Sequence, residues 1–194
     1  MVSNPRLRRL QADYENVRAE FSGHPHVTVE ALGPRVPPER YRVQFRLVGL
    51  FLNGDQPDYR EMHEVDITLP RAYPAEKPYC VPLSPIFHPN IKDYFCIADY
   101  WAASMSLVDV IVKLGEMIQW RVYNPRSPLD AIAARWAVQQ DESGLDVFPV
   151  GKVDLGVADF NVGLKSRPSI ASLAPLEDGS EPAVEDDFIV ALRS

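Results

Sequence analysis

The sequence predicts an α+β fold, in which a four-stranded antiparallel meander is flanked by an N-terminal helix and by C-terminal helices. Three observations support this prediction. Apolar residues recur every three or four positions over residues 4–21, alternate with polar residues in segments of 26–83, and return to a helical period after residue 106. No helical stretch separates the strand-like segments, which favours hairpin connections.

Residues 4–21 are expected to form an amphipathic helix. Asn4 is suited to cap this helix and Pro5 to its first turn, and Gly23 and Pro25 would end it. Its apolar stripe consists of Leu7, Leu10, Tyr14, Val17 and Phe21.

Four strands are then expected, with hairpin connections between them. Asn53-Gly54-Asp55 predicts the turn between the second and the third. The expected strands span residues 27–31, 43–52, 65–69 and 79–83.

The C-terminal half predicts two helices and an extension. Residues 106–120 begin with Ser106 and Asp109 at capping-box spacing. A further helix is expected over 127–140, capped by Ser127, with Pro128 and Asp130 in its first turn. We expect one domain over residues 1–143. Residues 144–194 would form an extended or partly ordered extension that docks on the domain or binds a partner.

Composition limits the classes of function. The 194-residue chain has a net charge of −7 and a pI near 5.1, which argues against nucleic acid as a main partner because phosphate-binding surfaces are usually basic. The sequence has no apolar run long enough to span a membrane and no secretory signal. We therefore expect a cytoplasmic protein with reduced cysteines and no membrane partner.

Residues 84–106 lack a regular period and carry the residues best suited to chemistry. Cys96 offers a thiol that can hold an acyl group as a thioester. Asn90, six positions earlier, offers an amide that can donate to the oxyanion formed when this thioester is attacked. The alternative for Asn90 is to hold the loop by backbone hydrogen bonds, and we expect both roles. His88 could act as a base for Cys96, which would make the protein a hydrolase.

Metals and cofactors are not expected. The two cysteines and four histidines show no ligand spacing, and the sequence has no Gly-rich phosphate loop. Cys80 lies in an apolar strand and is expected in the core.

Four motifs occur in the order typical of ubiquitin-conjugating enzymes, and residues 3–140 resemble that family. The motifs are Tyr73-Pro74-Ala75-Glu76-Lys77-Pro78, Ile86-Phe87-His88-Pro89-Asn90-Ile91, Cys96 followed by Trp101, and Asn124-Pro125-Arg126-Ser127-Pro128-Leu129. The resemblance implies that Cys96 accepts a ubiquitin-like modifier from an activating enzyme as a thioester. The modifier would then pass to an amine of a protein target.

The resemblance also implies roles for the surrounding residues. Asn90 would stabilise the oxyanion, and His88 would organise the loop. The residues expected to shape or pack the active site are Pro89, Trp101, Tyr73, Pro74 and Pro78. Arg6, Arg8 and Arg9 would form either a solvated helix face or a contact with the activating enzyme.

Several departures from the family pattern are informative. The segment between Asn90 and Cys96 is short and lacks the family's glycine. Ser127 stands where many members carry an acidic residue that guides the attacking lysine, so Asp99 and Asp93 are the alternatives for that role. A bulky apolar residue that faces RING-type ligases is replaced by alanine at position 75.

These departures resemble the conjugating enzymes of prokaryotic ubiquitin-like and anti-phage systems. The alternative function is a catalytically inactive member of the same fold that binds a ubiquitin-like protein or its activating enzyme. A cysteine in register with the His-Pro-Asn motif argues against that alternative.

Overall fold

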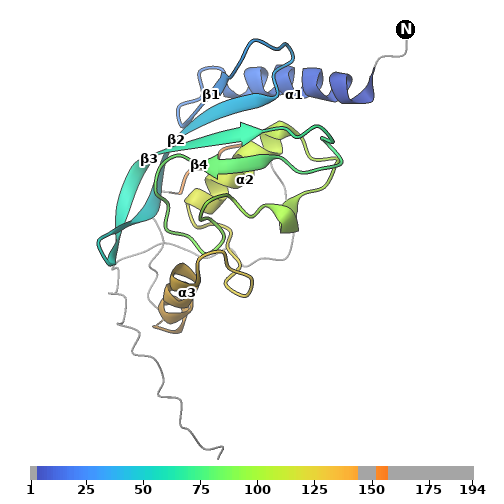
Figure 1. Cartoon of the computed structure of the whole chain (residues 1–194). Helices are drawn as coiled ribbons and strands as arrows, with labels where there is room; N and C mark the ends of the chain where they lie inside the picture. The colour runs from blue at the N-terminus through green and yellow to red at the C-terminus, as the bar shows by residue number, and fades with distance from the viewer. Residues whose placement is uncertain (1–3, 144–151, 157–194) are drawn as a thin grey trace, which may run out of the picture.

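The computed structural model describes residues 4–143 and 152–156, and it confirms the α+β fold (Figure 1). Four antiparallel strands form one sheet in the order β1-β2-β3-β4, so consecutive strands are neighbours. Helix α1 packs beside β1 and α2, and α2 lies against one face of the sheet. The elements are α1 (Pro5–Phe21), β1 (Val27–Ala31), β2 (Arg40–Asn53), β3 (Gln56–Thr68), β4 (Tyr79–Pro82), the 3-10 helix η1 (Ala98–Tyr100), α2 (Leu107–Ile118) and α3 (Ala131–Ser143).

The expected N-terminal caps of α1 and α2 are confirmed. The Asn4 side chain accepts a hydrogen bond from the main-chain N–H of Arg6 at 3.0 Å. At α2, Ser106 and Asp109 form both hydrogen bonds of a capping box. These short local motifs work because helix ends leave main-chain N–H groups that nearby side chains can satisfy.

The β2–β3 hairpin is longer than the sequence pattern indicated. The expected turn is correct, with Gly54 at φ +64° and Asn53 paired with Gln56. However, β3 begins at Gln56 rather than near residue 65. Most side chains over residues 56–62 are exposed or half-buried, so this arm lacks the alternation that burial of one face imposes.

The prediction for the last helix was wrong at its start. Helix α3 begins at Ala131, and Asp130 rather than Ser127 caps it. The Asp130 Oδ1 atom accepts hydrogen bonds of 2.9 and 3.0 Å from the N–H groups of the second and third helical residues. The main-chain N–H of Asp130 donates to Pro89 O at 3.0 Å, which holds the preceding link against another segment.

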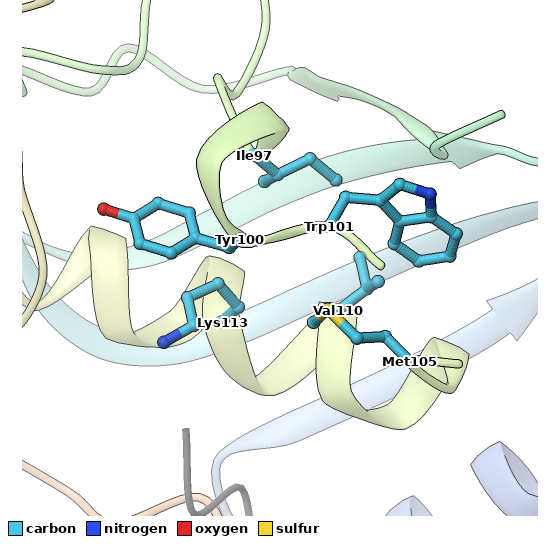
Figure 2. A pocket seen from close by; sticks show the side chains of 6 residues that line it. All are labelled: Ile97, Tyr100, Trp101, Met105, Val110 and Lys113. Carbon is cyan, nitrogen blue, oxygen red and sulfur yellow. The ribbon is translucent and has the colours of Figure 1, made fainter. Parts of the chain in front are cut away.

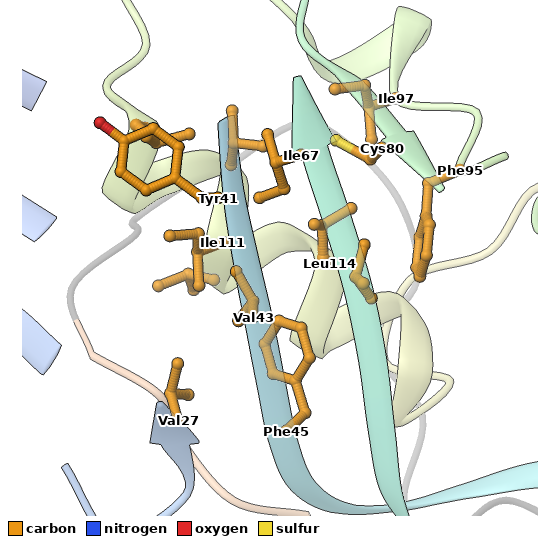
Figure 3. Close-up of a cluster of buried hydrophobic side chains, with 14 of the residues drawn as sticks. Val27, Tyr41, Val43, Phe45, Ile67, Cys80, Phe95, Ile97, Ile111 and Leu114 are labelled. Atoms are coloured by element: carbon orange, nitrogen blue, oxygen red, sulfur yellow. The ribbon is translucent and has the colours of Figure 1, made fainter. Parts of the chain in front are cut away.

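The main core lies between the sheet and α2 (Figure 3). Its fully buried side chains include Val43, Phe45, Val65, Ile67, Ile111 and Leu114. A smaller cluster joins α3 to the segment before the candidate active site and contains Leu50, Phe87, Trp120, Ala133, Trp136 and Ala137. No helix in the described part of the chain has the length and apolar character needed to cross a bilayer.

Part of the C-terminal extension docks on the domain. Leu155 is 2% exposed and belongs to the main core, and Val153 packs against that core. The remainder of the extension, including its acidic end, lies outside the described residues.

Candidate active site

The segment 88–96 folds back so that Asn90 and Cys96 become neighbours. The main-chain N–H of Cys96 donates to Asn90 O at 2.9 Å, and an antiparallel bridge between Ile91 and Phe95 closes the turn between them. Phe95 N donates to Cys80 O at 2.9 Å, which fixes the end of the loop to β4. The loop is therefore held by main-chain contacts on both sides.

The two cysteines differ in accessibility. Cys96 is partly exposed, whereas Cys80 is buried, and neither forms a disulfide. Burial raises the pKa of the Cys80 thiol to about 12, because an apolar interior disfavours the thiolate. Of the two residues, Cys96 is therefore the more accessible.

His88 is buried, and both of its ring nitrogens form hydrogen bonds to the main chain. Its Nδ1 accepts from Asn90 N at 3.0 Å, so Nε2 carries the proton and donates to Val122 O at 3.1 Å. Burial lowers the pKa of His88 to about 3. A buried, neutral imidazole with both nitrogens engaged argues against His88 as the base for Cys96, and so against the hydrolase alternative.

The Asn90 side chain joins the active-site loop to the link before α3. Its Oδ1 accepts from Asn124 N at 2.6 Å, and its Nδ2 donates to Asn124 O at 2.9 Å and Ser127 O at 3.1 Å. Asn90 is 4% exposed. Both amide hydrogens thus have carbonyl partners in this state, and donation to an oxyanion would require one of them to exchange.

Replacing Asn90 by alanine is expected to lower the free energy of unfolding by about 2–3 kcal/mol, because two carbonyls and one N–H lose their partner. Urea unfolding measures this change, with Asn16→Ala on the exposed face of α1 as the control. Unchanged stability combined with a loss of thioester discharge would instead assign Asn90 to the oxyanion alone.

The link 124–130 is also tied to the loop by the main chain. Pro89 O accepts hydrogen bonds from Leu129 N at 2.7 Å and Asp130 N at 3.0 Å. The Ser127 side chain is exposed, and Ser127 contributes its carbonyl to Asn90. The His-Pro-Asn and Asn-Pro-Arg-Ser-Pro-Leu motifs are therefore one structural unit, although 34 positions separate Asn90 from Asn124.

The 3-10 helix η1 and the residues after it cover the start of α2. Figure 2 shows Tyr100 and Trp101 beside α2, where the pocket is also lined by Ile97, Met105 and two residues of α2 itself, Val110 and Lys113. The Lys113 ammonium lies 5.2 Å from the centroid of the Tyr100 ring, and the Trp101 ring lies 5.8 Å from that of Tyr73. These side chains line a small, half-open pocket with an empty volume of about 170 Å³.

Tyr100 lies close enough to Asp99 and Cys96 to feel their charges. Burial, followed by the charges of Asp99 and of the Cys96 thiolate, raises the pKa of Tyr100 to about 12. Asp99 is exposed on η1, and Asp93 is exposed on the loop before Cys96.

The N-terminal arginines have separate environments. Arg6 forms an ion pair of 2.7 Å with Glu39, and Arg9 forms one of 2.7 Å with the buried Asp13. Arg8 is exposed. Two of the three arginines thus serve the fold, which leaves Arg8 as the exposed member of the cluster.

The turn before β4 packs as a rigid structural element. Tyr73 is 1% exposed, and its hydroxyl donates to Asp13 Oδ2 at 2.6 Å. Pro78 is buried, Pro74 is half-buried, and Ala75 is exposed.

Sequence reasoning missed Trp120, which supports the active-site loop. Its ring meets the His88 ring at 4.8 Å between centroids, and its Nε1 donates to Phe87 O at 3.0 Å. Trp120 follows the end of α2 with φ +56°, a conformation in which glycine is usual. Because glycine is the usual signal for such a helix end, the local sequence gave no indication of this residue.

The fold, a four-stranded antiparallel sheet with helices on its flanks, is that of the ubiquitin-conjugating class. The sequence profile described as ubiquitin-conjugating enzyme matches residues 44–144, and the chain belongs to that family. The chain is also similar to a crystal structure from Plasmodium yoelii, described as that of a candidate ubiquitin conjugating enzyme. The TM-score is 0.51 at 16% identity, over 74% of this chain and 90% of the other, which supports the fold. No curated protein matches the chain.

Proposed function

We propose that the protein is a ubiquitin-like protein conjugating enzyme whose thioester forms on Cys96. The observation that carries this proposal is that residue Cys96 is partly exposed and that its main-chain N–H is held by Asn90 O within the loop of residues 88–96. The partners would be a ubiquitin-like modifier, its activating enzyme and a protein target. No metal or small-molecule cofactor takes part in this chemistry at Cys96.

The reaction consists of two acyl transfers. The Cys96 thiolate attacks the carbonyl carbon of the modifier's thioester, the new C–S bond forms, and the thiolate of the activating enzyme leaves. A neutral amine of the target then attacks the same carbon. The amide bond forms, the Cys96 thiolate leaves, and the amine proton passes to solvent.

The test uses the full chain with its activating enzyme, the modifier and ATP. The wild type is expected to give an adduct that thiol reagents cleave, Cys96→Ser a thiol-resistant oxyester, and Cys96→Ala no adduct. Cys80→Ala is the matched control and should still form the labile adduct, because that thiol is buried. An adduct on Cys96→Ala would show the assignment to be wrong. Binding of the modifier without any adduct on the wild type would favour the inactive-scaffold alternative.

We assign Asp99 as the first candidate to guide the attacking amine in place of Ser127. Its carboxylate lies on η1 in the neighbourhood of Cys96, and an exposed carboxylate attracts an ammonium and can accept its proton. Discharge of the preformed thioester onto free lysine, compared between Asp99→Asn and Asp93→Asn, assigns the role. A defect only in Asp93→Asn would transfer it to that residue.

We place the protein in the cytoplasm, in a prokaryotic ubiquitin-like pathway of the anti-phage type. The short segment between Asn90 and Cys96 and the exposed Ala75 support this placement. The neighbouring genes in the genome test this placement. Genes for an activating enzyme and a ubiquitin-like protein are expected there, and unrelated neighbours would count against the placement.

A further inference from the structure

A notch in α2 receives a side chain from the C-terminal extension. Leu155 is 2% exposed, and a β-carbon added to Gly115 would overlap its Cδ1 atom. The same added atom would lie 3.3 Å from Leu47 Cδ1 and 3.4 Å from Phe45 Cε1. The missing side chain at position 115 therefore provides the space that Leu155 fills between the helix and the sheet.

The main chain of the extension is held beside this notch by one amide side chain. Gln119 is 2% exposed, its Oε1 accepts from Val153 N at 2.6 Å, and its Nε2 donates to Val153 O at 3.2 Å. Both main-chain groups of Val153 are thus paired, much as a neighbouring β-strand would pair them. Such pairing satisfies the main-chain hydrogen-bonding groups of an extended peptide and does not depend on the identity of its side chains.

The segment leaves the notch through a turn. Asp154 Oδ1 accepts from Gly156 N at 3.2 Å, and Gly156 has φ +111°, a conformation that few other residues adopt. A β-carbon at position 156 would lie 3.2 Å from Glu20 Oε1 on α1. The turn therefore fixes where the chain departs, beside the C-terminal end of α1.

The slot that holds this peptide has three parts. They are the apolar notch at Gly115, the Gln119 side chain that pairs with the main chain of Val153, and the turn at Gly156. We propose that residues 152–156 are an anchor, and that this slot fastens the C-terminal extension to the conjugating domain by noncovalent contacts alone. The occupant is this chain's own Val153–Leu155, in extended form. The anchor is separate from the thioester chemistry of Cys96, so either assignment can fail without the other.

The test begins with the full chain carrying a site-specific protease sequence within residues 144–151. After cleavage, the C-terminal fragment is expected to remain bound to the folded domain during size-exclusion chromatography at micromolar concentration. Leu155→Asp should release the fragment, because a carboxylate cannot be buried in the apolar notch. Asp154→Asn is the matched control and should retain it, since position 154 is exposed and asparagine keeps the acceptor. Separation of the wild-type fragments would overturn the proposal.

A double-mutant cycle in the uncut chain tests the contact directly. Gly115→Ala should lower the Tm of the otherwise native chain by about 5 °C, because its methyl group displaces Leu155. In a Leu155→Ala background the same substitution should lower the Tm far less, since the overlap with Leu155 Cδ1 is gone and alanine favours helix more than glycine does. Equal effects of Gly115→Ala in the two backgrounds would show that the anchor does not occupy the notch.

Discussion

Replacing Asp13 by alanine is expected to lower the free energy of unfolding by about 3–5 kcal/mol, the range typical of breaking a buried ion pair. Asp13 is 1% exposed. Its carboxylate accepts from Arg9 Nε at 2.7 Å, from the Tyr73 hydroxyl at 2.6 Å and from Leu107 N at 3.0 Å. These contacts join α1, the turn before β4 and the first residue of α2, so the substitution leaves three donors without their acceptor.

Urea unfolding of the Asp13→Ala and Asp13→Asn variants measures the effect. Asparagine keeps the shape and one acceptor oxygen, so its loss should be smaller than that of alanine but still clear, because the charge facing Arg9 is gone. Glu15→Gln is the control, since Glu15 is exposed on the same helix. A loss for Asp13→Ala no greater than for this control would show that the three contacts contribute little.

Acidification from pH 7 to pH 5 is expected to lower the free energy of unfolding by about 4 kcal/mol through His63 and His88 together. Each proton that the unfolded chain binds and the folded protein does not lowers this free energy by about 1.36 kcal/mol per pH unit. Both side chains are 0% exposed. Burial lowers the pKa of His63 to about 4 and that of His88 to about 3. The folded protein thus keeps both rings neutral, whereas the unfolded chain protonates them near the ordinary histidine pKa of about 6.5.

The stabilisation from these histidines is complete above the unfolded pKa. It is lost as the pH falls from about 6.5 toward the folded values, because there the unfolded chain binds more protons. Urea unfolding at several pH values should show the slope, and His63→Gln should remove about half of it. A slope that His63→Gln leaves unchanged would mean that this ring is protonated in the folded protein.

Local sequence signals predicted the elements whose causes are local. Asn4 caps α1, Ser106 and Asp109 form the capping box of α2, and Gly54 makes the hairpin turn. Each depends on residues within a few positions, so one short window contains the whole interaction. The α3 cap was mistaken because Ser127 and Asp130 both suit the role, and the contact of Asp130 with Pro89 is not local.

The candidate site was predicted as a set of residues but not as a geometry. The motif order indicated Cys96, Asn90 and His88. The sequence did not reveal that Asn90 donates both amide hydrogens to carbonyl oxygens of the link before α3. Nor did it reveal that the Trp120 ring packs against the His88 ring. Those contacts join positions more than 30 residues apart, and a one-chain pattern carries no signal of such pairing.

The sequence alone determined the alternation and helical periods that define an α+β meander, together with the motifs that indicate a conjugating enzyme. Only the tertiary structure decided which thiol is accessible, which histidine nitrogens are occupied, and where Leu155 returns to fill the space beside Gly115. The physical reason is that periodicity follows from local backbone geometry. Burial, pKa and side-chain pairing depend instead on neighbours that meet only when the whole chain has packed.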